Sequence, residues 1–259
     1  MLEVRIGDFH GESHPPENAR YNARLVLVHG LWTGAWLWRH FASFLAHRGW
    51  EVVAPDLRGR PQSRGARIAR VTVSDYFADL TEILSADQSP AVVIGHGVGG
   101  LLALEAAASL PVRAAVALAP PLPGTVTEEF RRALRRGGGV FRRPLPPPDT
   151  LTPDAAIDAA QLQPDSPRVA RALLAGELSP RRPLVPAAIV AGVRDPWVDA
   201  GALEEWAARL GAAFLSRDAA HYGLAARGFE RQVDAIHRWI VSVLGSDLLK
   251  LTGTEDLDE

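Results

Sequence analysis

The sequence predicts an α/β fold in which a mostly parallel β-sheet carries helices on both faces. Short apolar runs have the continuous burial pattern of parallel strands, at 25–28, 51–54, 91–94, 114–118, 187–190 and 212–215. Longer amphipathic stretches alternate with them, near 36–48, 74–86, 98–109, 199–210 and 228–244. Strands that alternate with helices in this way are typical of a parallel sheet covered on both sides.

The composition is that of an ordinary globular protein. The chain has 259 residues, 47% of them hydrophobic and 22% charged, which suits one large α/β domain. A formal charge of −2 gives no reason to expect nucleic acid or an anionic membrane as partner. The absence of cysteine excludes disulfides, thiolate catalysis and cysteine–zinc sites. The sequence shows neither a signal-peptide layout nor an apolar run of roughly 20 residues, so we expect a cytoplasmic protein.

The interval 120–186 between predicted strands is much longer than the others. Such a long connection is usually a lid or an inserted subdomain. Residues 154–176 have helical composition, and Ser166-Pro167 is typical of a helix start. The basic segment 131–136 is expected to be a solvated face of the lid, with contact to an anionic substrate or carrier protein as the alternative.

These patterns divide the chain into a core, a cap and a tail. The core is expected at 1–119 and 187–246, the cap or lid at 120–186, and a flexible acidic tail at 247–259.

The segment 95–99 has the G-x-S-x-G spacing of a nucleophile elbow, with Gly97 in the place of the serine. It lies between a predicted strand and a predicted helix, as that motif requires. The elbow backbone is strained, at about 1–3 kcal/mol for a non-glycine residue, and glycine tolerates it. We therefore expect an intact turn with empty space where the serine side chain would be. Both a native and an engineered origin of Gly97 remain open.

Two loops provide backbone N–H groups that suit an oxyanion hole. The first predicted strand, 25–28, ends in His29-Gly30, and Leu31 is the next residue. In acyl-transfer enzymes of this layout, the N–H after the strand and the N–H after the elbow residue stabilise an oxyanion. Leu31 and Val98 hold these positions. The alternative is that His29-Gly30 only makes a tight turn from strand to helix.

An acid and a histidine follow later strands. Asp195 comes directly after the strand at 187–190, and His221 follows the last strand. Asp195 could instead cap the next helix, a role that Asp199 is also placed to take. A lone histidine in a loop is often incidental, but the order elbow, acid, histidine is that of hydrolase triads.

Taken together, the chain resembles the α/β-hydrolase superfamily. The resemblance rests on five features in order: His29-Gly30, the loop Asp56 to Arg60, the elbow at 95–100, Gly192 to Asp195, and His221. It implies a central eight-stranded, mostly parallel sheet with a helical cap after the sixth strand. Gly97 departs from the family pattern and argues against covalent chemistry.

Three functions fit a site of this kind. The first is a cofactor-free enzyme in which His221, held by Asp195, is a general base for elimination or cyclisation of a carbonyl compound, as in natural-product biosynthesis. The second is hydrolysis of an ester, thioester or lactone by a water in the Gly97 space. The third is a ligand-binding protein without catalysis. The expected partner is a small molecule, which a carrier protein could deliver, in a pocket lined by His29, Gly30, Trp32, His96 and Trp197.

Overall fold

The computed structural model describes residues 1–135 and 157–248 of the chain. Its strands form one eight-stranded sheet: β1 (Leu2–Ile6), β2 (Phe9–His14), β3 (Arg24–Val28), β4 (Glu51–Pro55), β5 (Ala91–His96), β6 (Ala114–Leu118), β7 (Ala187–Gly192) and β8 (Ala213–Arg217). The α-helices are α1 (Arg39–His47), α2 (Val73–Ser85), α3 (Val98–Ser109), α4 (Glu128–Arg135), α5 (Pro167–Ala175), α6 (Ala200–Leu210) and α7 (Phe229–Leu244). Five short 3-10 helices complete the described elements: η1 (Ala35–Trp38), η2 (Ile68–Arg70), η3 (Ala159–Gln161), η4 (Gly223–Ala225) and η5 (Gly245–Leu248).

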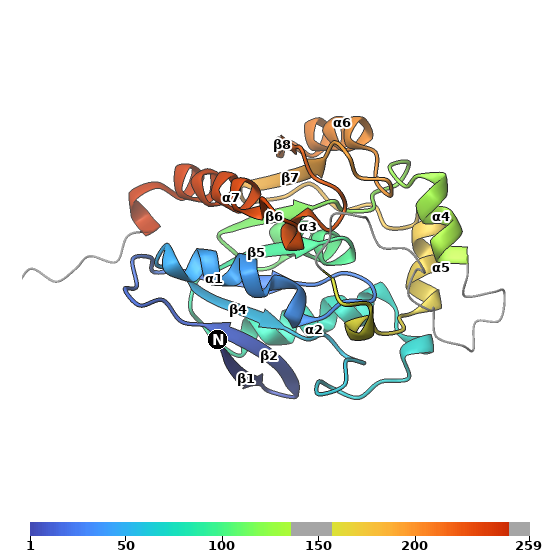
Figure 1. Cartoon of the computed structure of the whole chain (residues 1–259). Helices are drawn as coiled ribbons and strands as arrows, with labels where there is room; N and C mark the ends of the chain where they lie inside the picture. Colours follow the sequence, from blue (N-terminus) through green and yellow to red (C-terminus); the bar gives the residue numbers. More distant parts are fainter. Residues whose placement is uncertain (136–156, 249–259) are drawn as a thin grey trace, which may run out of the picture.

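The strand order β1-β2-β4-β3-β5-β6-β7-β8 confirms the predicted fold class (Figure 1). Strands β3 to β8 pair in parallel, whereas β1 and β2 form an antiparallel edge. The apolar runs predicted the six parallel strands, but the edge pair was implied only by the family resemblance. Its sequence hides the pattern, because β1 is largely exposed and β2 buries Glu12, whose carboxylate pairs with Arg39 at 2.7 Å.

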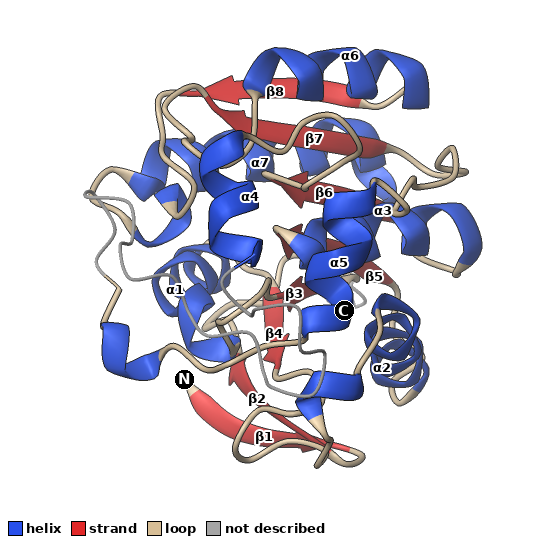
Figure 2. Ribbon diagram, turned by 90° about the vertical axis from the view of Figure 1, so that its right-hand side faces the viewer, coloured by secondary structure: helices blue, strands red, loops and turns tan. Residues whose placement is uncertain are grey.

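Helices cover both faces of the sheet. Helices α1 and α7 pack together on one side, and α2 and α3 lie on the other (Figure 2). Helix α3 is buried over nearly its whole length, since it packs against both β5 and β6. This explains its uniformly apolar sequence.

The two outer glycines of the elbow motif are required by close packing. A Cβ on Gly95 would overlap the carbonyl oxygen of Gly99, and a Cβ on Gly99 would overlap the carbonyl oxygen of Val28. Both obstacles are backbone atoms, which cannot move aside as a flexible side chain can. The glycines at 95 and 99 therefore let α3 begin directly against the sheet.

The interval between β6 and β7 contains α4, η3 and α5. Helices α4 and α5 lie beyond the carboxyl ends of the central strands (Figure 1). The predicted start of α5 is confirmed, because the Ser166 hydroxyl accepts hydrogen bonds from the N–H groups of Arg168 and Val169. A helix over all of 154–176 is wrong. Pro164 and Pro167 cannot donate backbone hydrogen bonds, and only η3 precedes α5 in the described part of this stretch.

Some predictions fall on residues outside those described. They are the helical reading of 154–156, Arg136 of the basic segment, and residues 249–259 of the acidic tail. Within the described ranges, no helix combines the length and the apolar character needed to cross a bilayer.

Candidate active site

Gly97 forms the turn between β5 and α3 with φ 56° and ψ −122°. This left-handed φ strains any residue with a side chain. Its N–H donates to the Leu118 carbonyl at 2.9 Å, which ties the turn to β6. A Cβ placed on Gly97 would have Gly30 Cα, 3.8 Å away, as its nearest neighbour. Packing therefore leaves room for a side chain here, in contrast to Gly95 and Gly99.

His221 and Asp195 form a buried hydrogen-bonded pair. The Nδ1 atom of His221 lies 2.8 Å from Asp195 Oδ2, and the two side chains are 4% and 1% exposed. The other carboxylate oxygen accepts the N–H groups of Trp197 at 2.8 Å and Val198 at 3.1 Å. Asp195 thus fixes the loop after β7 and also holds Nδ1–H of the imidazole. Asp199, not Asp195, caps α6, because its Oδ1 accepts from Ala202 N.

The backbone N–H groups of Leu31 and Val98 have no hydrogen-bond partner within the described part of the chain. Val98 is the first residue of α3, where N–H groups lack intrahelical acceptors. The two loops meet closely, since a Cβ on Gly30 would lie 3.6 Å from Gly97 Cα. The helix terminus adds positive potential, which favours an oxygen bearing negative charge.

His96 packs directly on the His221 imidazole. The ring centroids are 4.7 Å apart, and His96 Nε2–H donates to the His221 carbonyl at 3.0 Å. Burial and the neighbouring His221 lower the pKa of His96 to about 3, so its imidazole is neutral at pH 7. Its Nδ1 is then a buried acceptor without a partner among the described residues, 3.4 Å from where a Cβ on Gly30 would lie.

His29 is placed differently from its predicted position in the pocket wall. Its Nδ1–H donates to the Gly30 carbonyl at 2.9 Å, and its Nε2 accepts the Leu57 N–H at 3.1 Å. Burial and nearby Arg60 lower the pKa of His29 to about 4, which keeps the ring neutral. With both nitrogens occupied, His29 joins the loop after β3 to the loop after β4 and has no polar atom left for a ligand.

Aromatic side chains enclose the dyad. The Trp197 ring lies 4.7 Å from the His221 ring and is stacked on Phe130 at 5.0 Å between centroids. Trp32 meets both Trp197 and Phe130 edge-on, at 5.9 and 6.2 Å. The sequence predicted Trp32 and Trp197 as neighbours of the site. It did not predict Phe130, which comes from α4 in the cap.

A buried carboxylate of the cap, Asp165, anchors the loop after β3. Its Oδ2 accepts the Trp32 N–H at 2.9 Å and pairs with the Arg60 guanidinium, and its Oδ1 accepts from Tyr76 and Ser166 N, each at 2.7 Å. Burial raises the pKa of Asp165, but Arg60 and these hydrogen bonds outweigh it and hold the pKa below its usual value.

This anchor explains the backbone of Trp32. Its φ of 63° is unusual for a bulky residue and costs about 1–3 kcal/mol unless its surroundings impose it. The Trp32 N–H is held by Asp165, and its carbonyl accepts the Gln163 N–H at 2.9 Å. Cap residues 163–165 therefore fix the peptide groups that follow Leu31.

Replacing Asp165 by alanine should destabilise the protein by about 3–5 kcal/mol, because Arg60 would remain buried without its counter-charge. Urea unfolding measures the effect. The matched control is Asp158→Ala in the same cap segment, where only the exposed cap of η3 is lost, at about 1 kcal/mol. Equal losses for the two variants would show that the buried pair does not hold the cap to the core.

The described residues bring together most of the predicted site: Gly30, Leu31, Trp32, His96, Gly97, Val98, Asp195, Trp197 and His221. Within the described ranges, no group of three or more histidine, aspartate or glutamate side chains is arranged to hold a metal ion. The site thus offers one hydrogen-bonded imidazole, a pair of backbone donors and a space at Gly97.

The chain belongs to the alpha/beta hydrolase family, whose sequence model matches residues 25–242. Among solved structures, it is similar to the monoacylglycerol lipase of Paleococcus ferrophilus, with a TM-score of 0.71 and 17% identity over 91% of this chain and 99% of that one. It is also similar to the bottromycin epimerase BotH, with a TM-score of 0.62 and 22% identity over 93% and 98% of the two chains. These likenesses extend over nearly the whole fold.

Curated relatives match a shorter stretch. The putative carbamate hydrolase RutD of Variovorax paradoxus (strain S110) is 33% identical over 107 residues, which are 41% of this chain and 39% of that protein. Esterase PIR7B of Oryza sativa subsp. japonica is 35% identical over 122 residues, covering 41% and 44% of the two chains. The alignment therefore spans less than half the length of either relative.

Proposed function

We propose that this protein is a cofactor-free enzyme that uses the His221–Asp195 pair as a general base and forms no covalent intermediate. The observation that carries this proposal is the intact 2.8 Å hydrogen bond of the pair beside an elbow residue without a nucleophile. Acyl-enzyme chemistry needs a side-chain nucleophile at position 97, because loss of a triad serine costs about 10⁶ in rate.

The preferred reaction is proton abstraction next to a carbonyl group, followed by elimination or ring closure. With Nδ1–H held by Asp195, the Nε2 lone pair of His221 takes the proton. The electrons of the broken C–H bond form an enolate, and the N–H groups of Leu31 and Val98 stabilise its oxygen. In elimination, the enolate expels a carboxylate from the β-carbon as the carbon–carbon double bond forms, and the imidazolium then returns its proton to solvent. Natural-product biosynthesis is the setting we propose.

The fold accommodates such a departure from ester hydrolysis. BotH, which shares the fold, is named as an epimerase. The enclosing rings of Trp32, Phe130 and Trp197 suit an apolar substrate.

Direct hydrolysis is the second candidate. It is supported by the space at Gly97 and by the unpartnered Nδ1 of His96 beside Gly30, an acceptor that can hold a water molecule. His221 would remove a proton from this water as its oxygen attacks an ester carbonyl, and the alcohol would leave with a proton from the imidazolium. The names of the curated relatives, a carbamate hydrolase and esterases, also favour it.

Assays of β-acyloxy ketones and aryl esters with the wild type and His221→Ala test the proposal. We expect wild-type turnover without an initial burst, and a loss of about 10²–10⁴ in kcat/KM for His221→Ala, because general-base catalysis contributes that much. Elimination releases an unsaturated ketone and hydrolysis releases an alcohol, so product analysis decides between the two reactions.

His40→Ala is the matched control, since His40 lies on α1 and its ring faces Phe229 rather than the dyad. It should retain wild-type rates. Unchanged turnover by His221→Ala would overturn the assignment of the base.

A further inference from the structure

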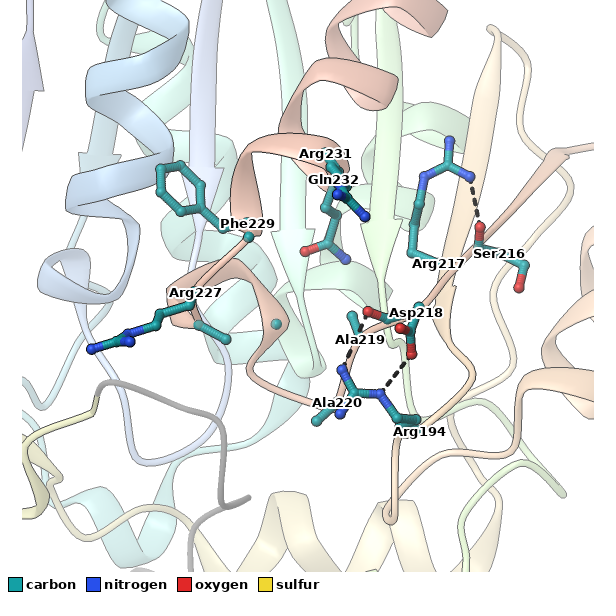
Figure 3. Close-up of a pocket in the computed structure, with 13 residues that line it drawn as sticks. Arg194, Ser216, Arg217, Asp218, Ala219, Ala220, Arg227, Phe229, Arg231 and Gln232 are labelled. Atoms are coloured by element: carbon teal, nitrogen blue, oxygen red, sulfur yellow. Dashed lines mark hydrogen bonds and ion pairs between the residues drawn. The ribbon is translucent and has the colours of Figure 1, made fainter.

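A second cavity lies behind the loop that carries His221. It has a volume of about 850 Å³ and is bordered by the end of β8, the loop 218–228 and the first turn of α7 (Figure 3). Ala219, Ala220 and Gly223 line it, while the His221 side chain between them is only 4% exposed and packs against Trp197 on the buried side. The loop therefore separates the cavity from the candidate active site.

The cavity wall is strongly cationic. Four arginines and one aspartate line it: Arg194, Arg217, Arg227, Arg231 and Asp218. Arg194 pairs with Asp218 at 2.6 Å, so that carboxylate already has a counter-charge. Arg217 donates to the carbonyl of its neighbour Ser216 at 2.6 Å, and Arg231 pairs with no carboxylate among the described residues. Figure 3 shows Arg194, Arg217 and Arg231 around the hollow, whereas Arg227 extends away from them.

Gln232 supplies the second, independent observation. The residue is only 9% exposed, yet its amide makes no hydrogen bond within the described part of the chain, and its Oε1 is fully buried. The side chain projects from α7 into the space between Arg231 and Gly223 (Figure 3). Leaving such a buried amide unpaired costs about 1–3 kcal/mol, so the site is suited to a ligand that can bond to it.

We propose that this cavity binds the phosphoryl group of a small phosphorylated ligand, through the guanidinium groups of Arg217 and Arg231 and the amide of Gln232. Two arginines without a paired carboxylate match the double charge of a phosphate monoester better than the single charge of a carboxylate. The first turn of α7 adds its positive terminus, against the one exposed carboxylate of Glu230. The cavity volume leaves room for the rest of the ligand.

Isothermal titration of the full chain with inorganic phosphate and with glycerol 3-phosphate tests this site at constant ionic strength, with chloride as the reference anion. We expect saturable binding with Kd below about 1 mM, and the ester should bind at least as tightly as phosphate. Much weaker binding of the ester would overturn the proposal, because the cavity would then accept only the free ion. Absence of saturable binding would overturn it as well.

Variants at the cavity provide the comparison. Arg231→Gln and Gln232→Leu should each raise Kd about tenfold, whereas Arg227→Gln removes the same charge from the same loop and should change Kd less than about twofold. Gln232→Leu should also keep or raise the melting temperature, because it removes a buried unpaired amide. Equal weakening by Arg227→Gln and Arg231→Gln would show only a general electrostatic effect and would overturn the site.

Discussion

Gly97→Ser should react with a fluorophosphonate probe at least about 10³-fold faster than the wild-type protein. The reason is that His221 and Asp195 are already in hydrogen-bonding position, and the space at Gly97 accepts a Cβ without a close contact. Restoring the serine should recover part of the roughly 10⁶ that removal of a triad serine costs. The serine oxygen bonds to phosphorus, fluoride leaves, and His221 takes the hydroxyl proton. Gel fluorescence or intact mass measures the adduct.

The control for this gain is the double variant Gly97→Ser, His221→Ala. Its labelling should fall back towards the wild-type level, since the serine would have no base. If the double variant is labelled as fast as Gly97→Ser, the dyad does not activate position 97. The substitution itself should cost about 1–3 kcal/mol in stability, because φ at this position is 56°.

Gly95→Ala should destabilise the fold by more than about 4 kcal/mol, an exceptional loss for one methyl group. The added Cβ would overlap the Gly99 carbonyl, so α3 would have to move off the sheet. Gly97→Ala should lose only about 1–3 kcal/mol, from backbone strain without a clash.

Urea unfolding of the two glycine variants, together with Gly65→Ala, measures this difference. Gly65 is exposed and has no neighbour within 4 Å of an added Cβ, so its replacement should leave stability nearly unchanged. A Gly95→Ala protein as stable as Gly97→Ala would contradict the close packing of α3 on β5.

The sequence predicted the parallel core well because its strands are buried on both faces. Helix α3 has the predicted bounds, since the glycine-rich turn before it is a sharp signal. Strand β2 escaped detection because its buried positions include Glu12 and His14, which break the apolar pattern. An ion pair with Arg39, formed across the fold, makes this burial tolerable and leaves no local trace in the sequence.

The candidate site was predictable where it depends on backbone turns and not where it depends on the cap. Gly97, Asp195 and His221 follow strands that end at one edge of the sheet, so chain order alone placed them together. Phe130 and Asp165 reach the site from the cap between β6 and β7, and no local pattern links them to Trp32. Only the described three-dimensional structure shows that the cap both encloses the dyad and fixes the loop of Leu31.

The central claim, that this protein acts without a covalent intermediate, is tested most directly by intact-protein mass spectrometry of the wild type during turnover of β-acyloxy ketones and aryl esters. We predict product release with the enzyme at its unmodified mass at all times, including rapid-quench time points. An acyl adduct that forms and decays at the rate of turnover would contradict the account and would require a nucleophile elsewhere in the site.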